Sequence, residues 1–202
     1  MPRKHRDLHG NVPDKSAWAL VLIDVINDLE FDGGAALLRY ATVMAPKLAR
    51  LKQRAYRSGV PVIYINDNFG KWQSDFSAQV RHCLEDGVRG EPIVRQLAPT
   101  EHDYYILKPK HSGFFATPLA MLLDYLQAKT LVLTGIAGDN CVLFTANDAY
   151  LREFELFVPS DCVVSASKAR NDAALAQLRH LVKADTRPST RIRFPRSNER
   201  AN

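Results

Sequence analysis

Three residues of this chain could take part in one reaction: Asp24, Lys108 and Cys141. Cys141 follows an apolar, strand-like run (residues 130–134) and a turn (135–140), and it precedes a helix-like stretch. A thiol at the start of a helix lies near a partial positive charge, which favours the thiolate form. Unpaired backbone N–H groups in such a turn can also bind a developing oxyanion. Cys141 therefore suits a nucleophile, and the alternative is an inert buried cysteine.

Asp24 and Lys108 each lie just past another strand-like run, residues 18–23 and 104–107. An aspartate beside a cysteine can act as a general base, and a lysine beside both stabilises the carboxylate and the thiolate. Each also has an ordinary interpretation, Asp24 as a turn cap and Lys108 as an exposed strand-end lysine. Parallel strands present their carboxyl ends at one edge of a sheet, so three such residues at that edge favour a shared site.

Strand and helix signals alternate along the chain. Strands are predicted at about 18–23, 60–65, 104–107, 130–134 and 156–158, and helices at about 37–58, 74–84, 118–127, 141–152 and 168–182. This alternation predicts an α/β fold, a three-layer α/β/α sandwich with a central, mostly parallel sheet. Pro46 predicts a kink in the first helix or the start of a second one. The last helix is expected to bury Ala174, Leu175, Leu178 and Leu181.

The 202 residues suit a single domain, with a core at about 16–186 and a basic C-terminal tail at about 187–202. The net charge of +5 resides largely in basic termini, and no nucleic-acid motif accompanies them, so no nucleic-acid partner is expected. No apolar run is long enough for a membrane span, and residues 1–6 lack the apolar centre of a signal peptide. Three cysteines are too few and odd in number for a disulfide framework. A cytoplasmic protein is expected.

Three segments, residues 22–28, 107–115 and 134–142, resemble those of the isochorismatase-like cysteine hydrolases. That family includes nicotinamidases, N-carbamoylsarcosine amidases and ureidoacrylate amidohydrolases, and the resemblance runs in order from about residue 18 to about 185. It implies a flavodoxin-like α/β sandwich and a catalytic triad of Cys141, Asp24 and Lys108. It also implies a cis peptide bond between Ile136 and Ala137, with an oxyanion hole made by the backbone N–H groups of Ala137 and Cys141.

Departures from the family pattern narrow the range of expected substrates. Nicotinamidases carry an Asp-x-His set and further histidines for a metal ion, whereas here Asp67 matches but Phe69 stands where a histidine is expected. His82 and His102 are isolated in sequence and are interpreted as surface residues. Nicotinamidase activity and a metal site are therefore not expected. Isochorismatases proper lack the nucleophilic cysteine, so Cys141 also argues against vinyl-ether cleavage.

The sequence thus predicts a metal-independent, cofactor-free cysteine hydrolase that cleaves a small amide or related C–N bond through a thioester. Two alternatives stay open: hydrolysis of an ester or another carbonyl substrate on the same scaffold, and a non-catalytic binding protein that engages acidic partners through its basic tail. Relatives often assemble, so a homo-oligomer is expected. The expected pocket walls are Asn68, Trp72, Phe114 and Asn140.

Overall fold

The computed structural model describes residues 15–70 and 75–195. Its sheet has the strand order β3-β2-β1-β4-β5, with β6 pairing to β4, and every pair is parallel. The α/β fold class predicted from the sequence is confirmed. The strands are β1 Trp18–Ile23, β2 Val62–Asp67, β3 Tyr104–Lys108, β4 Thr130–Ile136, β5 Glu155–Phe157 and β6 Val163–Val164.

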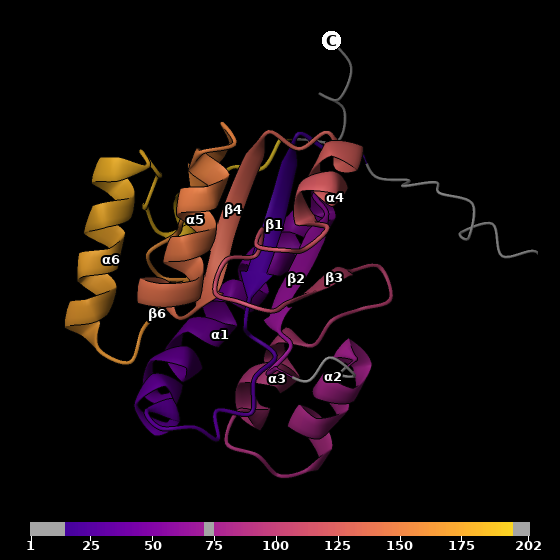
Figure 1. The fold of residues 1–202 in the computed structure, drawn as a ribbon, viewed down its shortest axis with the longest axis vertical. Helices are drawn as coiled ribbons and strands as arrows, with labels where there is room; N and C mark the ends of the chain where they lie inside the picture. Colours follow the sequence, from indigo (N-terminus) through magenta and orange to yellow (C-terminus); the bar gives the residue numbers. More distant parts are fainter. Residues whose placement is uncertain (1–14, 71–74, 196–202) are drawn as a thin grey trace, which may run out of the picture.

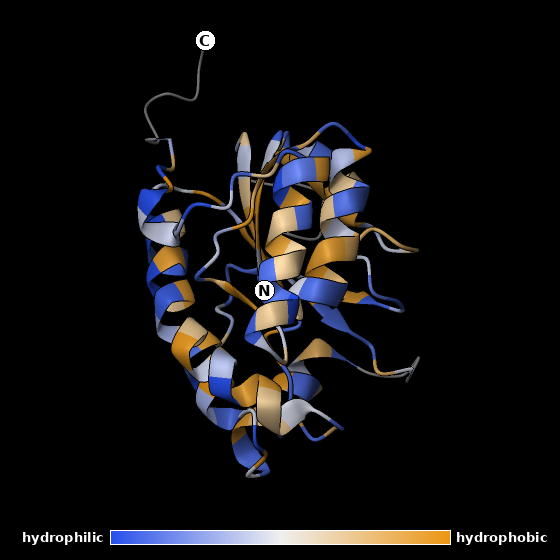
Figure 2. Ribbon diagram, turned by 90° about the vertical axis from the view of Figure 1, so that its left-hand side faces the viewer, coloured by the Kyte–Doolittle hydropathy of each residue, from blue (hydrophilic) through white to orange (hydrophobic). Residues whose placement is uncertain are grey.

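Six α-helices of the described residues cover the two faces of this sheet (Figure 1). Helices α1 (Gly34–Arg57), α2 (Phe76–Glu85) and α3 (Glu91–Leu97) share one apolar core with one face. Helices α4 (Leu119–Leu126), α5 (Leu143–Tyr150) and α6 (Lys168–Leu181) share a second core with the other face. Figure 2 shows the apolar strands between helices that carry many hydrophilic residues.

Strand β1 lies at the centre and is buried on both faces. Leu20 and Leu22 pack toward α1, whereas Val21 and Ile23 pack toward α4 and α5, and all four are 0% exposed. A strand covered on both sides needs apolar residues at successive positions, which explains the continuous apolar run in the sequence. The chain builds outward from β1 to β2 and β3, then returns to place β4 on the other side of β1. Strand ends diverge at such a reversal and leave a crevice for ligands.

Several helical details differ from the sequence-based expectations. Helix α1 continues through Pro46 as a single 24-residue helix. Helix α3 was not predicted, although Pro92 near its start is a signal for a helix N-terminus. Leu181 was expected to face the core but is 59% exposed. The residue that follows helix α6, Val182, takes the inward position and is 4% exposed.

The C-terminal segment also departs from the expectation of a solvated tail beginning at residue 187. Ile192 is 3% exposed, and Arg54 on α1 donates hydrogen bonds to the carbonyl oxygens of Ser189 and Ile192, at 2.6 and 3.3 Å. Phe194 packs edge-on against Trp18, with ring centroids 5.9 Å apart. Apolar residues between the arginines thus anchor the segment, so the folded core extends beyond residue 186. Among the described residues, no helix is both long and apolar enough to cross a membrane.

Candidate active site

The carboxyl ends of β1, β3 and β4 bring Asp24, Lys108 and Cys141 together. Lys108 Nζ lies 2.9 Å from Asp24 Oδ2 and 3.6 Å from Cys141 Sγ. The Asp24 carboxyl group also interacts with the Cys141 thiol and raises its pKa. Lys108 is buried beside Asp67 in the β2–β3 register rather than exposed at a strand end. The three side chains therefore form one contact group.

The Asp24 carboxylate is held on both oxygens. Oδ1 accepts the backbone N–H of Asp67 at 2.7 Å, while Oδ2 faces the Lys108 ammonium. The Asp24 backbone has φ of 51°, and its N–H donates to the Ile65 carbonyl oxygen at 2.8 Å. A non-glycine residue with positive φ is uncommon and persists where its surroundings hold it. The backbone thus aims this carboxylate at the thiol and the ammonium.

Burial controls the protonation of the group. Burial raises the pKa of the Asp24 carboxyl above its ordinary value of 3.8, against the opposing effect of Lys108. Burial lowers the pKa of Lys108, but the charges of Asp24, Cys141 and Asp67 outweigh this and raise the pKa overall, so the ammonium persists. Burial and then Asp24 raise the pKa of the Cys141 thiol to about 12. A raised pKa favours the thiol form, in the opposite direction to the helix start, which was expected to favour the thiolate.

The turn that carries Cys141 packs against neighbouring elements of the fold. It forms a π-helical turn, η2 (Gly138–Val142), immediately before α5, and the Ile136–Ala137 peptide bond that precedes it is cis, where the resemblance implies one. A Cβ atom at Gly138 would lie 2.5 Å from Asn171 Oδ1 on α6 and 2.7 Å from Val163 Cγ1 on β6, so a larger residue would have to displace these side chains. The Asp139 N–H donates to Ser165 Oγ at 3.1 Å. The cysteine is therefore presented by a turn packed between β4 and α6.

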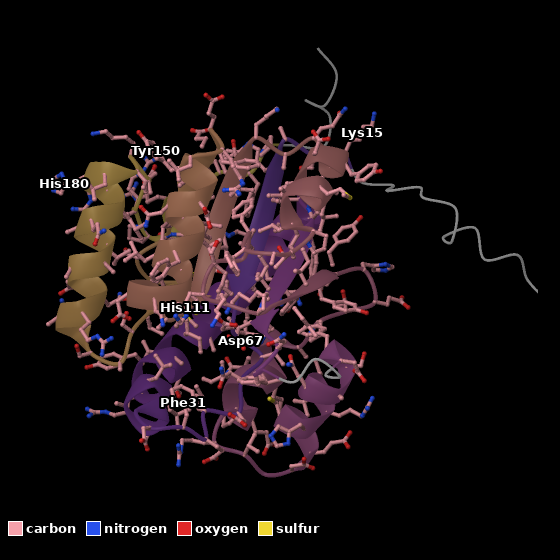
Figure 3. All side chains as sticks on the ribbon, in the orientation of Figure 1. Lys15, Phe31, Asp67, His111, Tyr150 and His180 are labelled. Carbon is pink, nitrogen blue, oxygen red and sulfur yellow. The ribbon has the colours of Figure 1, made fainter. Side chains whose placement is uncertain are left out.

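A cavity of about 440 Å³ opens onto this group. Asp24, Ala137 and Cys141 lie at its catalytic side. The rest of the described wall comes from the loops after β1, β2 and β3, from the end of β2, and from Leu37, Ile136 and Asn140. Figure 3 labels Asp67 and His111 near the strand ends and Phe31 lower, beside α1. The wall residues from the loops and the end of β2 are Asn27, Asp28, Glu30, Phe31, Asp67, Phe69 and His111.

Only part of the expected pocket wall lines this cavity. Asn140 does. Asn68 supports the loop instead, because its Oδ1 accepts the Gly70 N–H at 2.9 Å and its N–H donates to the Lys108 carbonyl oxygen at 3.0 Å. Trp72 lies outside the described residues.

Phe114 is a correction to the expected wall. It is 6% exposed and packs in the core under α4 and α5, with the Phe154 ring 6.1 Å away. The hydrogen bond from the Gly113 N–H to Thr145 Oγ1 (3.0 Å) ties the segment to α5, away from the cavity. Sequence reasoning also missed pocket residues. His111 could have been found as the third residue after Lys108, whereas nothing near Phe31 marks it as a wall residue.

Metal ligation fits this site poorly. Across residues 15–70 and 75–195, no three His, Cys, Asp or Glu side chains are grouped to hold a metal ion. Asp67, the residue that matches the nicotinamidase pattern, has Oδ1 bonded to the Phe69 N–H and Oδ2 3.5 Å from the Lys108 ammonium. A cation at that distance competes directly with a divalent ion for the carboxylate. His82 and His102 are largely exposed, as expected, with side chains 47% and 83% accessible.

The model of the isochorismatase domain matches residues 18–187 of the chain. The chain belongs to the isochorismatase family. It is 41% identical to the uncharacterised isochorismatase family protein YaaI of Bacillus subtilis over 171 residues, which cover 85% of this chain and 93% of that protein. It is 27% identical to the ureidoacrylate amidohydrolase RutB of Methylorubrum extorquens, covering 76% and 72% of the two chains.

Solved structures agree with this membership. The crystal structure of N-carbamoylsarcosine amidase from Thermoplasma acidophilum superposes with a TM-score of 0.67 and 26% identity, covering 88% of this chain and 99% of that one. The protein is therefore an isochorismatase-family hydrolase of the amidase-like type.

Proposed function

We propose that this isochorismatase-family hydrolase cleaves a small amide or related C–N bond by cysteine catalysis, without a metal ion or cofactor. The observation that carries the proposal is the buried contact group of Asp24, Lys108 and Cys141, which opens onto a cavity of about 440 Å³. A buried lysine and aspartate are costly to keep charged, and such groups cluster at functional sites. The amidase and amidohydrolase among its relatives support an amide as the scissile group.

The first half of the reaction forms a thioester. As Cys141 Sγ attacks the amide carbonyl carbon, Asp24, which interacts with the thiol, accepts its proton. The raised pKa of Asp24 makes its carboxylate a stronger base than an exposed aspartate. The backbone N–H groups of Ala137 and Cys141 bind the oxyanion, a contribution of about 3 kcal/mol per donor. Asp24 then gives its proton to the departing amine.

The second half hydrolyses the thioester. Asp24, again a carboxylate, takes a proton from water as the water oxygen attacks the acyl carbon, and Cys141 leaves with that proton. Lys108 stays protonated throughout, because its pKa is raised by the surrounding carboxylates and thiol. Its positive charge offsets the negative charge that moves between the carboxyl and the sulfur.

Replacing the nucleophile tests this assignment. The variant Cys141→Ala should lose at least about 10³-fold in kcat/KM on an amide that the native protein hydrolyses. Cys83→Ala is the matched control, since Cys83 is buried on α2 and does not line the cavity. Rapid quenching and intact-mass measurement should detect an acyl adduct on Cys141 in the native protein only. Retained amidase activity in a folded Cys141→Ala protein would contradict the mechanism, and preference for esters over amides would contradict the substrate class.

A further inference from the structure

The charges around Cys141 do not balance. The single ammonium of Lys108 faces two carboxylates, Asp24 Oδ2 at 2.9 Å and Asp67 Oδ2 at 3.5 Å. The group thus has two carboxyl groups against one ammonium, an excess of one acidic side chain. The side chains of Lys108 and Asp24 are 0% and 8% exposed, whereas that of Asp67 is 32% exposed. The excess charge is therefore accessible to a ligand at Asp67.

The rest of the described cavity wall supplies no lysine or arginine to offset this charge. It adds two further carboxylates, and each has a partner outside the cavity. Asp28 Oδ2 lies 3.4 Å from His82 Nε2, and Glu30 Oε2 lies 3.1 Å from a guanidinium nitrogen of Arg89. Asp67 has no ion-pair partner of its own among the described residues, because it shares Lys108 with Asp24. An anionic substrate would meet net repulsion here.

Two aromatic side chains line the same cavity as this carboxylate. Phe31 and Phe69 are each 48% exposed. The backbone N–H of Phe69 donates to Asp67 Oδ1 at 2.6 Å and so holds the carboxylate. Aromatic faces attract cations and also cover apolar groups. A cavity lined by a carboxylate and two phenyl groups suits a positively charged organic group.

We propose that the substrate is a small amide bearing an ammonium or similar cationic group, which Asp67 binds while the amide carbonyl lies against Cys141. This inference rests on the proposed function and deepens it. Asp67 is then a specificity-determining residue. Phe31 and Phe69 enclose the cationic group, and the acidic wall excludes amides that carry a free carboxylate.

The charge preference can be measured without any hydrolysis. Methanethiosulfonates transfer their organic group to a thiol as a disulfide and release methanesulfinate, and they exist as matched cationic (2-trimethylammonioethyl) and anionic (2-sulfonatoethyl) reagents. Rates of Cys141 modification, followed by peptide mass mapping and divided by the rates with free 2-mercaptoethanol, should favour the cation at least about 10-fold. High salt should reduce this ratio because it screens charges at the partly exposed Asp67. A ratio of one or less would overturn the proposal.

The variant Asp67→Asn identifies the residue responsible. It should lower the cation-to-anion ratio of the normalised modification rates at least about fivefold. The control Asp28→Asn removes a carboxylate that has its own partner and should change this ratio less than twofold. A ratio unchanged in Asp67→Asn, or reduced equally in both variants, would overturn the role of Asp67. If Asp67→Asn fails to fold, the same comparison is made with Asp67→Ser, and an unchanged ratio in that variant would overturn the role of Asp67.

Amide turnover separates this inference from the proposed function. The probes are β-alaninamide, butanamide and succinamate, which are similar in size and are cationic, neutral and anionic. The expected order of kcat/KM is cationic, neutral, anionic, and the cationic-to-neutral ratio should fall in Asp67→Asn. Because that ratio is taken within one variant, any effect of the substitution on the catalytic group cancels. If none of the three amides is hydrolysed but Cys141 still reacts faster with the cationic reagent, the amidase assignment is wrong and the charge inference is supported. A faster anionic amide would overturn the charge inference alone.

Discussion

At the scale of single residues, the site depends on removing water from three ionisable side chains at once. Burial raises the pKa of both Asp24 and Cys141, which are the proton acceptor and the proton donor of the proposed first step. A raised pKa favours the thiol form, which reacts more slowly than a thiolate with oxidants and alkylators. In the proposed mechanism the nucleophile is activated when Asp24 accepts its proton.

The pH dependence of kcat/KM should report this burial. The reaction needs the carboxylate form of Asp24, so activity is present above the pKa of this group and is lost as the pH falls through it. Because that pKa is raised, the acidic limb should lie above pH 3.8. The raised pKa of Lys108 should keep the ammonium, and hence activity, beyond pH 9. A pH profile of a stable native protein checks this, and an acidic limb at or below pH 3.8 would contradict the burial argument.

Replacing Lys108 should cost both activity and stability. The Lys108 side chain is 0% exposed and pairs with a buried carboxylate. Removing it leaves Asp24 without its partner ammonium, a change that typically costs about 3 kcal/mol or more. We expect turnover to fall at least about 10³-fold and the urea midpoint to decrease. The exposed Lys110→Ala is the control and should change neither. Native-like turnover in a folded Lys108→Ala protein would refute the triad.

At the scale of elements, the crevice exists because β1 and β4 pair tightly up to the residues that precede the site. Ile23 pairs with Gly135; β1 ends at Ile23, and β4 ends one residue after Gly135, at Ile136. Gly135 has φ of 114°, and a Cβ atom there would lie 2.0 Å from the Ile23 carbonyl oxygen. The close approach of the two backbones therefore depends on this glycine. It sets the separation between Asp24 and the turn that carries Cys141.

Gly135→Ala should accordingly destabilise the protein by about 3 kcal/mol or more, since backbone strain and overpacking add together. Gly87→Ala is a matched control, because Gly87 also has positive φ (67°) but nothing lies within 4 Å of the added Cβ. The control substitution should lower the free energy of unfolding by about 1–2 kcal/mol. Urea unfolding of both variants gives the comparison. Equal losses of unfolding free energy in the two variants would show that the close approach of β1 and β4 adds no cost beyond backbone strain.

At the scale of the whole molecule, the described residues place the chemistry within one chain and leave no cluster suited to a metal ion. Hydrolysis should therefore persist after exhaustive chelation and stop after treatment with a thiol alkylator. Limiting alkylator should label Cys141 first, because Cys83 and Cys162 are both buried. Loss of activity on chelation with recovery on adding zinc or manganese would refute metal independence. The expected homo-oligomer stays a prediction, which light scattering at micromolar concentration would test.

The parallel sheet and both ends of β1 could be predicted from the sequence, whereas β2 and β4 end two residues later than expected, at Asp67 and Ile136. Buried strands and amphipathic helices leave periodic apolar patterns, and strand ends then place Asp24, Lys108 and Cys141 at one edge. Other features depend on the tertiary structure, because no local sequence pattern encodes them. The tertiary structure buried Lys108 completely, raised the pKa of the Cys141 thiol, turned Phe114 into the core and brought Phe31 and His111 to the cavity. Burial and loop direction depend on neighbours far away in sequence. The protonation of the thiol and the charge of the pocket therefore follow only once the chain is folded.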